Sequence, residues 1–141
     1  MSFEDLPENW DDRPLTDPAL LSDVLDLVVF EKDRAAGAVS FLLCDDEARL
    51  VQPVTIGELP ATMTQAERVH FVSVMVEGMG HCGAMVVALA RDDGLSITAD
   101  DQAWLRAATQ ACGDDVRLLG VHVVTMTGSR VVPPPALDRS A

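Results

Sequence analysis

Apolar residues in the first part of the chain recur at helical spacing. Between residues 18 and 28, five of them fall on one face of a helix: Leu20, Leu21, Val24, Leu25 and Val28. Asp17 can cap this helix, and Pro18 suits its first position because no N–H is needed there. The pattern therefore predicts a first helix over residues 18–28.

Two short apolar segments follow, at residues 39–44 and 50–56, and the acidic turn at 45–47 joins them. Two such segments separated by a short polar turn predict a β-hairpin. Pro53 cannot donate to a sheet ladder, so we expect the second strand at a sheet edge or beside a bulge.

Helical spacing returns after Thr64, which has Glu67 three residues further on, as in a capping box. The second helix should end at Gly78 and Gly80.

The run AMVVALA, residues 84–90, has no polar alternation and should form a central strand that is covered on both faces. A third helix is expected to begin at Thr98 and to stop at Gly113. An apolar strand over residues 116–126 and a short strand over residues 130–132 follow it. Hairpin strands followed by strands that helices separate predict an α/β (α+β) fold, a mixed sheet flanked by about three helices.

The chain length of 141 residues fits a single domain. We expect this domain to span residues 17–132, between an N-terminal arm of residues 1–16 and a proline-rich C-terminal tail of residues 133–141. Whether this arm is ordered depends on which part of the domain Trp10 and Leu15 pack against.

The composition excludes several classes of partner. The formal net charge is -13 and aromatic residues make up 4%, whereas nucleic-acid binding needs clustered Lys and Arg and rings that stack on bases. The apolar runs fall short of the ~18 residues that span a bilayer. The acidic N-terminus lacks the basic region of a secretory signal. We therefore expect a cytoplasmic protein that binds neither nucleic acid nor membrane.

The cysteines do not form a recognisable metal or disulfide pattern. Cys44, Cys82 and Cys112 are widely spaced among apolar or small residues, which favours reduced thiols in the core. His81 beside Cys82 could contribute metal ligands, but no second pair completes a tetrahedral site. We interpret both residues as structural or surface positions, and we expect no cofactor.

A polar cluster lies at the carboxyl end of the predicted central strand, where open α/β sheets usually place ligands. Its members are Arg91, Asp92, Asp93, Asp100 and Asp101. It is either a solvated turn with an Arg–Asp pair or a vestigial pocket that binds a small molecule or a peptide without chemistry.

Four segments resemble landmarks of the RadC-like branch of the JAB/MPN superfamily: FLLCDDEARLV, AMVVALA, ITADDQAWLRAA and LLGVHVVTMTG. The resemblance covers residues 38–132 and implies the cytidine-deaminase-like fold of that superfamily. Zinc-bearing members carry a His-x-His-Pro motif after the central strand, then a Ser or Thr with an Asp three residues later, and a glutamate on the hairpin as general base. Two imidazoles and one carboxylate leave a fourth zinc position for an activated water.

The match to this motif is incomplete. Thr98 and Asp101 match the Ser/Thr-x-x-Asp element, which is equally a helix capping box. The two histidine positions fall on Leu89 and Arg91, and the proline position falls on Asp92. An arginine at this place would repel a zinc ion.

The place of the glutamate falls near Gly37 and Ala38, neither of which can act as a base. The resemblance therefore implies a catalytically inactive domain that serves as a binding or scaffolding module for a small ligand or a protein partner. A homodimer through an exposed edge strand is also consistent with it. The alternative is a metal-dependent hydrolase that holds its metal through His81, Cys82 and Asp101.

Overall fold

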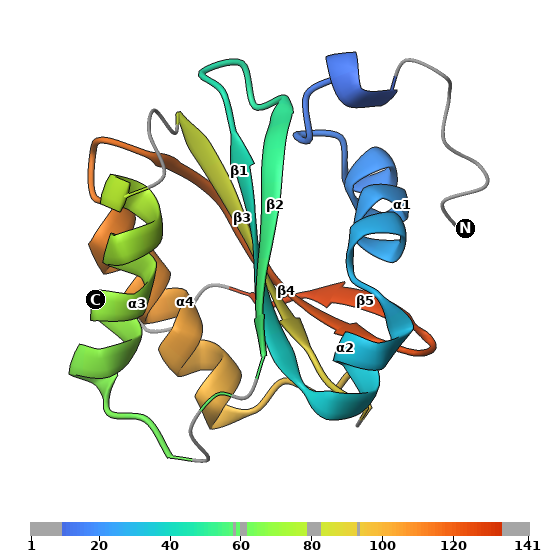
Figure 1. Ribbon diagram of the computed structural model, residues 1–141, viewed down its shortest axis with the longest axis vertical. Coiled ribbons are helices and arrows are strands. Elements are labelled where there is room, and N and C mark those ends of the chain that lie inside the picture. Colours follow the sequence, from blue (N-terminus) through green and yellow to red (C-terminus); the bar gives the residue numbers. More distant parts are fainter. Residues whose placement is uncertain (1–9, 58, 60–61, 79–82, 93, 134–141) are drawn as a thin grey trace.

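The fold is an α/β single domain, in which helices pack on both faces of one mixed sheet (Figure 1). The computed structural model describes residues 10–57, 59, 62–78, 83–92 and 94–133. Within these residues there are five strands: β1 (Ala38–Cys44), β2 (Leu50–Gly57), β3 (Ala84–Ala90), β4 (Arg117–Thr125) and β5 (Gly128–Val131). The same residues form four α-helices: α1 (Pro18–Val28), α2 (Glu31–Ala36), α3 (Gln65–Gly78) and α4 (Ala99–Cys112).

The strand order β2-β1-β3-β4-β5 makes β3 the middle strand of the sheet. β1 is antiparallel to both β2 and β3, β3 and β4 are parallel, and β5 is antiparallel to β4. All seven residues of β3 are buried, because helices cover the sheet on either side of it. This confirms the position predicted from its unbroken apolar run.

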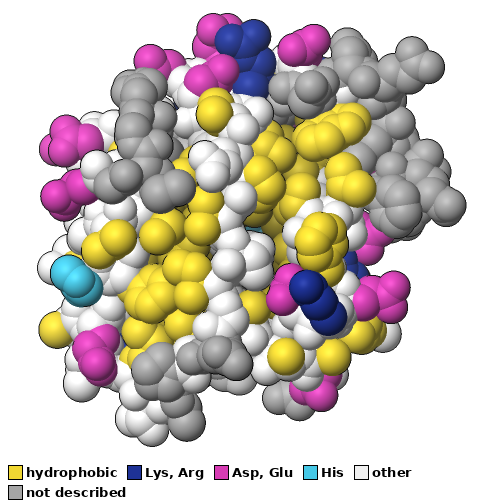
Figure 2. All heavy atoms as spheres, in the orientation of Figure 1, with side chains coloured by type: hydrophobic (Ala, Val, Ile, Leu, Met, Phe, Trp, Pro, Cys, Tyr) yellow, Lys and Arg dark blue, Asp and Glu magenta, His cyan; other side chains and the backbone are white. Residues whose placement is uncertain are grey.

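β2 lies at one edge of the sheet, as Pro53 predicted. Its pairing with β1 is irregular, since Leu43 faces Gln52 and the next residue of β1 faces Leu50, which leaves Val51 as a bulge. Val51 is 64% exposed. Apolar side chains are visible on both sides of β2 in Figure 2, where the edge of the sheet is only partly covered.

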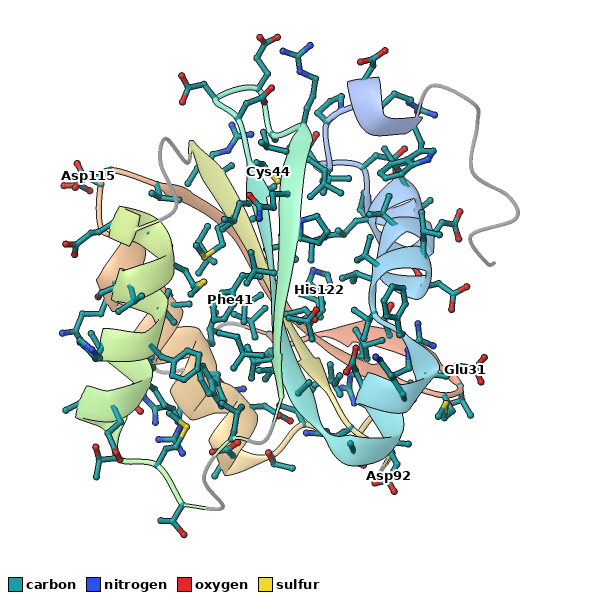
Figure 3. All side chains as sticks on the ribbon, viewed as in Figure 1. Glu31, Phe41, Cys44, Asp92, Asp115 and His122 are labelled. Atoms are coloured by element: carbon teal, nitrogen blue, oxygen red, sulfur yellow. The ribbon has the colours of Figure 1, made fainter. Side chains whose placement is uncertain are left out.

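α3 and α4 cover the first face of the sheet. Phe41 of β1 points toward these helices (Figure 3), and its ring stacks on Phe71 of α3 with a centroid distance of 6.3 Å. Phe71 in turn meets Trp104 of α4 edge-on at 6.3 Å. These rings connect both helices to the sheet through one apolar core.

The second face is covered by α1, α2 and the described end of the N-terminal arm. Leu15 is 1% exposed, and its N–H donates to the carbonyl of Ala48 at 2.8 Å. Trp10, in the short 3-10 helix η2 (Trp10–Asp12), packs against the same core. The two arm residues singled out in the sequence therefore cover this face.

The expectation of about three helices is wrong, because α2 was missed. α2 has six residues, fewer than two helical turns, and buries only Arg34 among them. A segment this short cannot show an apolar repeat. The predicted first, second and third helices correspond to α1, α3 and α4, and Asp17 caps α1 by accepting a hydrogen bond from the Ala19 N–H at 3.1 Å.

Two of the three cysteines, Cys44 and Cys112, are buried in the two cores, as predicted. Cys82 lies outside the described residues. In the part of the chain that the structure describes, no helix has the length and apolar character needed to cross a bilayer.

Candidate functional site

A pocket of about 260 Å³ opens at the carboxyl end of β3, between the start of β1 and the first turns of α4. Its apolar walls come from Val39, Leu59, Leu89 and Trp104. Leu59 follows β2, so four separate stretches of chain form one concavity. Ligand sites in α/β proteins commonly lie at such a strand end.

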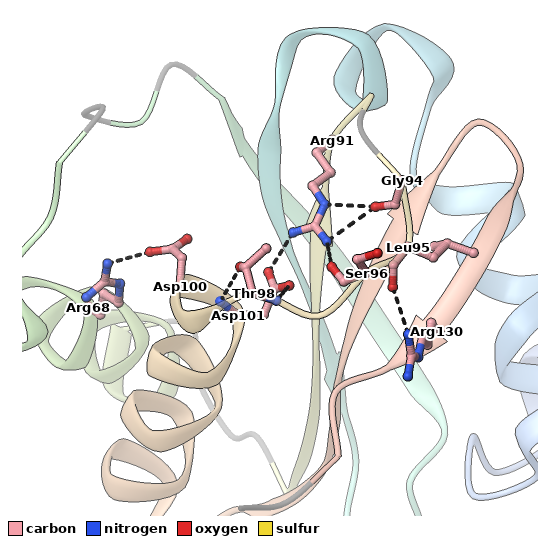
Figure 4. A network of polar contacts seen from close by, with 9 residues as sticks. All are labelled: Arg68, Arg91, Gly94, Leu95, Ser96, Thr98, Asp100, Asp101 and Arg130. Carbon is pink, nitrogen blue, oxygen red and sulfur yellow. Dashed lines mark hydrogen bonds and ion pairs between the residues drawn. The ribbon is translucent and has the colours of Figure 1, made fainter.

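Arg91 follows β3 and is the cation of this pocket (Figure 4). Its Nη1 donates to Oδ1 of Asp101 at 2.7 Å, and its Nη2 donates to the carbonyl of Ser96 at 2.6 Å. Nε and Nη2 both donate to the carbonyl of Gly94 at 3.3 Å. The Arg91 side chain is 20% exposed and that of Asp101 only 2%. The ion pair therefore joins the end of β3 to the start of α4 and also fixes the connecting loop.

Asp101 is bound through both of its carboxylate oxygens. While Oδ1 accepts from Arg91, Oδ2 accepts from the Thr98 N–H at 2.8 Å. The hydroxyl of Thr98 accepts from the Asp101 N–H at 3.1 Å, which completes the predicted capping box. Both carboxylate oxygens of Asp101 therefore already accept hydrogen bonds, and one of the donors is a cation that would repel a metal ion.

Most of the positions that the resemblance assigns to the zinc motif line the same pocket, whereas Asp92 and Thr98 do not. Leu89, Arg91 and Asp101 lie along it, and Gly37 and Ala38 lie at its β1 side. Leu89 is 6% exposed and packs into the core of the first face. The residues at the two histidine positions thus supply an apolar wall and a cation, neither of which can bind a metal ion.

The remaining members of the predicted polar cluster are more exposed than Asp101. Asp100 also lines the pocket, but it is 60% exposed and pairs with Arg68 of α3. Asp92 is exposed at the surface, and Asp93 lies outside the described residues. The cluster is therefore a buried Arg91–Asp101 pair with exposed carboxylates around it.

The described residues do not support the alternative metal site formed by His81, Cys82 and Asp101. His81 and Cys82 lie outside them. The next described residue, Gly83, precedes the amino end of β3, whereas Asp101 pairs with Arg91 at the carboxyl end of β3. At the usual rise per strand residue, the two ends of β3 are about 20 Å apart. Across the described residues, no group of three or more His, Cys, Asp and Glu side chains could hold a metal ion.

Two of the residues that line the pocket were not predicted from the sequence. Leu59 and Trp104 come from segments far apart in the chain, and nothing in the local pattern of either places them together. Trp104 could have been found, since it follows Asp101 by three residues and so lies on the same face of α4.

His122 of β4 has a pKa that is lowered by burial, and it faces the other side of the sheet (Figure 3). Burial against apolar neighbours, among them Leu15, Leu21 and Leu119, lowers the pKa of His122 to about 4. The imidazole is therefore neutral at pH 7. It has no contact with the pocket at the end of β3.

Comparison of the chain with protein-family models, curated proteins and solved structures found no match. The family resemblance therefore rests on the sequence landmarks alone. Function has to be argued from the geometry of the pocket.

Proposed function

We propose that the chain is a JAB/RadC-like domain that has lost zinc chemistry and acts as a non-catalytic binding module. The observation that carries this proposal is the Arg91–Asp101 ion pair, with a 2.7 Å contact between Nη1 and Oδ1. In this interpretation the guanidinium neutralises the buried carboxylate, which a zinc ion would do in a catalytic relative. Among the described residues that line the pocket, none near Gly37 and Ala38 offers a general base.

The pocket favours an uncharged, largely apolar ligand group. Arg91 is neutralised by Asp101, and Asp100 is neutralised by Arg68, so neither charge is left to bind an ion. The volume of about 260 Å³ is smaller than that of usual drug-sized sites and fits a small molecule or one or two side chains of a partner.

Binding at this pocket is favoured over strand pairing between two copies. β2 carries both Pro53 and the bulge at Val51. β5 has only four residues and is followed closely by Pro133. Prolines, bulges and short strands are the features by which sheet edges resist the addition of another strand. We therefore place partner binding at the pocket and not at the edges of the sheet.

Metal analysis of the purified protein tests the loss of zinc chemistry. After expression in zinc-supplemented medium, elemental mass spectrometry should find far less than one zinc per chain. One zinc per chain would overturn the proposal. Its loss in a His81→Ala, Cys82→Ala double variant would then support the alternative hydrolase.

Ligand binding at the pocket is tested by NMR of the two tryptophan indoles. Trp104 lines the pocket, whereas Trp10 packs on the opposite face of the sheet and serves as an internal control. Small uncharged aromatic amides should shift the Trp104 indole signal and leave that of Trp10 unchanged. Shifts of both signals, or of neither, would argue against a binding function at this pocket.

A further inference from the structure

Phe30 occupies a position where local structure favours a polar residue. It is the N-cap of α2, yet its side chain makes no capping hydrogen bond, and it is 58% exposed. Ser, Thr, Asp and Asn are preferred at N-caps because their side chains accept from the free N–H groups of the first turn. With Phe30 at this position, α2 therefore has no side-chain cap and an aromatic ring is exposed to water. Such a conflict between local structure and sequence is typical of functional positions.

Met126 shows the same conflict. It is the first residue of the two-residue turn that connects β4 to β5, where Thr125 pairs with Gly128. Tight hairpin turns favour Asn, Asp and Gly, whereas this turn presents a methionine that is 47% exposed.

Phe30 and Met126 line one groove of about 550 Å³, which also contacts Leu27 and Val29 at the end of α1. The groove is thus formed by the α1–α2 connection and the β4–β5 turn, which are almost 100 residues apart in the sequence. Two exposed apolar side chains that line one concave surface indicate an interaction site.

The walls of this groove are held in place by Arg34, which is 5% exposed. Its Nη1 donates to the carbonyl of Thr125 at 3.2 Å, and its Nη2 donates to the carbonyl of Asp26 at 3.1 Å. These bonds tie α1, α2 and the end of β4 together, so the groove is formed before a partner binds.

The charged residues that line the groove are Asp26, Glu31 and Arg34, so its lining carries a net negative charge, and the exposed Lys32 follows Glu31 on α2. Asp92 is exposed at the same end of the molecule (Figure 3). Arg34 is already paired with Asp26. Because the whole chain has a net charge of -13, a partner with basic residues is attracted at long range and an acidic one is repelled.

We propose that the groove formed by Leu27, Val29, Phe30 and Met126 binds a basic amphipathic segment of a partner protein. Apolar side chains of that segment pack on Phe30 and Met126, and its Lys or Arg side chains face the acidic rim. Methionine suits such a surface because its flexible side chain adapts to different partners. This surface is separate from the pocket at the end of β3, so the two proposals can fail independently.

A synthetic amphipathic helical peptide of Leu and Lys serves as the probe, and calorimetry measures its binding to the full chain. Phe30→Ser and Met126→Ser should each weaken binding about tenfold or more, as the loss of an apolar anchor usually does. Val74→Ser is the matched control, since Val74 is 45% exposed on α3 and should leave binding unchanged. Phe30→Ser also supplies a better N-cap, so its thermal stability should equal or exceed that of the parent chain.

Each other result would overturn the proposal. Equal binding by the parent, Phe30→Ser and Met126→Ser would show that the peptide is held by bulk charge alone. Equal binding of a matched Leu–Glu peptide would remove the requirement for a basic partner. Absence of binding would exclude this class of segment. A parent dimer in sedimentation that Phe30→Ser dissociates would identify the groove as a contact between two copies.

Discussion

Replacement of Arg91 by Met should destabilise the fold by leaving a buried carboxylate without its cation. Met keeps an unbranched stem but loses the bond to Oδ1 of Asp101 and the bonds to the carbonyls of Gly94 and Ser96. Asp101, which is only 2% exposed in the parent chain, then keeps a single donor to its side chain, the Thr98 N–H.

The size of the effect follows from the burial of the pair. Removal of one partner from a fully buried ion pair costs about 3–5 kcal/mol. Because the Arg91 side chain is 20% exposed, water can enter and partly solvate Asp101 in the variant. We therefore expect the free energy of unfolding to fall by about 2–3 kcal/mol.

Denaturant unfolding followed by circular dichroism measures this change, and a double-mutant cycle with Asp101→Asn assigns it to the pair. Asn still accepts from the Thr98 N–H but carries no charge, so the double variant should be more stable than the sum of the single effects predicts. Arg68→Met is the control, because its partner Asp100 is 60% exposed and such a pair contributes about 1 kcal/mol or less. An Arg91→Met effect no larger than that of the control, or strictly additive effects in the cycle, would refute the reasoning.

Two further predictions concern α4 and His122. Thr98→Ala should lower the free energy of unfolding by about 1 kcal/mol through loss of the α4 cap, whereas Thr109→Ala on the same helix should change it by less than about 0.5 kcal/mol; equal effects would contradict the capping role. His122 has a folded pKa of about 4 against 6.5 when unfolded, so the unfolded chain takes up the proton first as pH falls. Stability should therefore be lost between about pH 6.5 and pH 4, by up to about 3 kcal/mol, in the parent relative to His122→Leu; parallel pH profiles of the two would contradict this.

Features that depend on neighbouring residues in the sequence could be predicted. The caps at Asp17 and Thr98 act over two or three residues, and the confirmed ends of α1 and α4 follow from them. The unbroken apolar run of β3 placed it in the middle of the sheet, since it leaves no face for water. Pro53 placed β2 at an edge for an equally local reason.

Features that depend on distant segments could not be predicted. α2 is held by Arg34, whose contacts to Thr125 and Asp26 come from other elements. The lowered pKa of His122 follows from its burial, which no single strand reveals.

The pocket at the end of β3 was predicted only in part. An Arg–Asp pair in the turn was one of the interpretations considered. Its burial, however, depends on the path of the loop through Gly94 and Ser96, and the apolar wall formed by Leu59 depends on where the chain leaves β2. The sequence therefore located the polar residues of the site and suggested a pocket there, but it did not predict the apolar walls formed by Leu59 and Trp104.

Under the proposed function, Arg91 stands where a zinc-bearing JAB/MPN domain would hold its metal. Calorimetric zinc titration of the Leu89→His, Arg91→His double variant tests this placement. The two imidazole rings would be two residues apart at the end of a strand, so they would lie on the same face and could bind zinc together with Asp101. Addition of Asp101→Asn to this variant is the control and should weaken zinc binding. The double variant should bind one zinc per chain, and the parent should bind none. Zinc binding no better than that of the parent would contradict this placement and would leave residues 91–101 as a simple strand-to-helix connection.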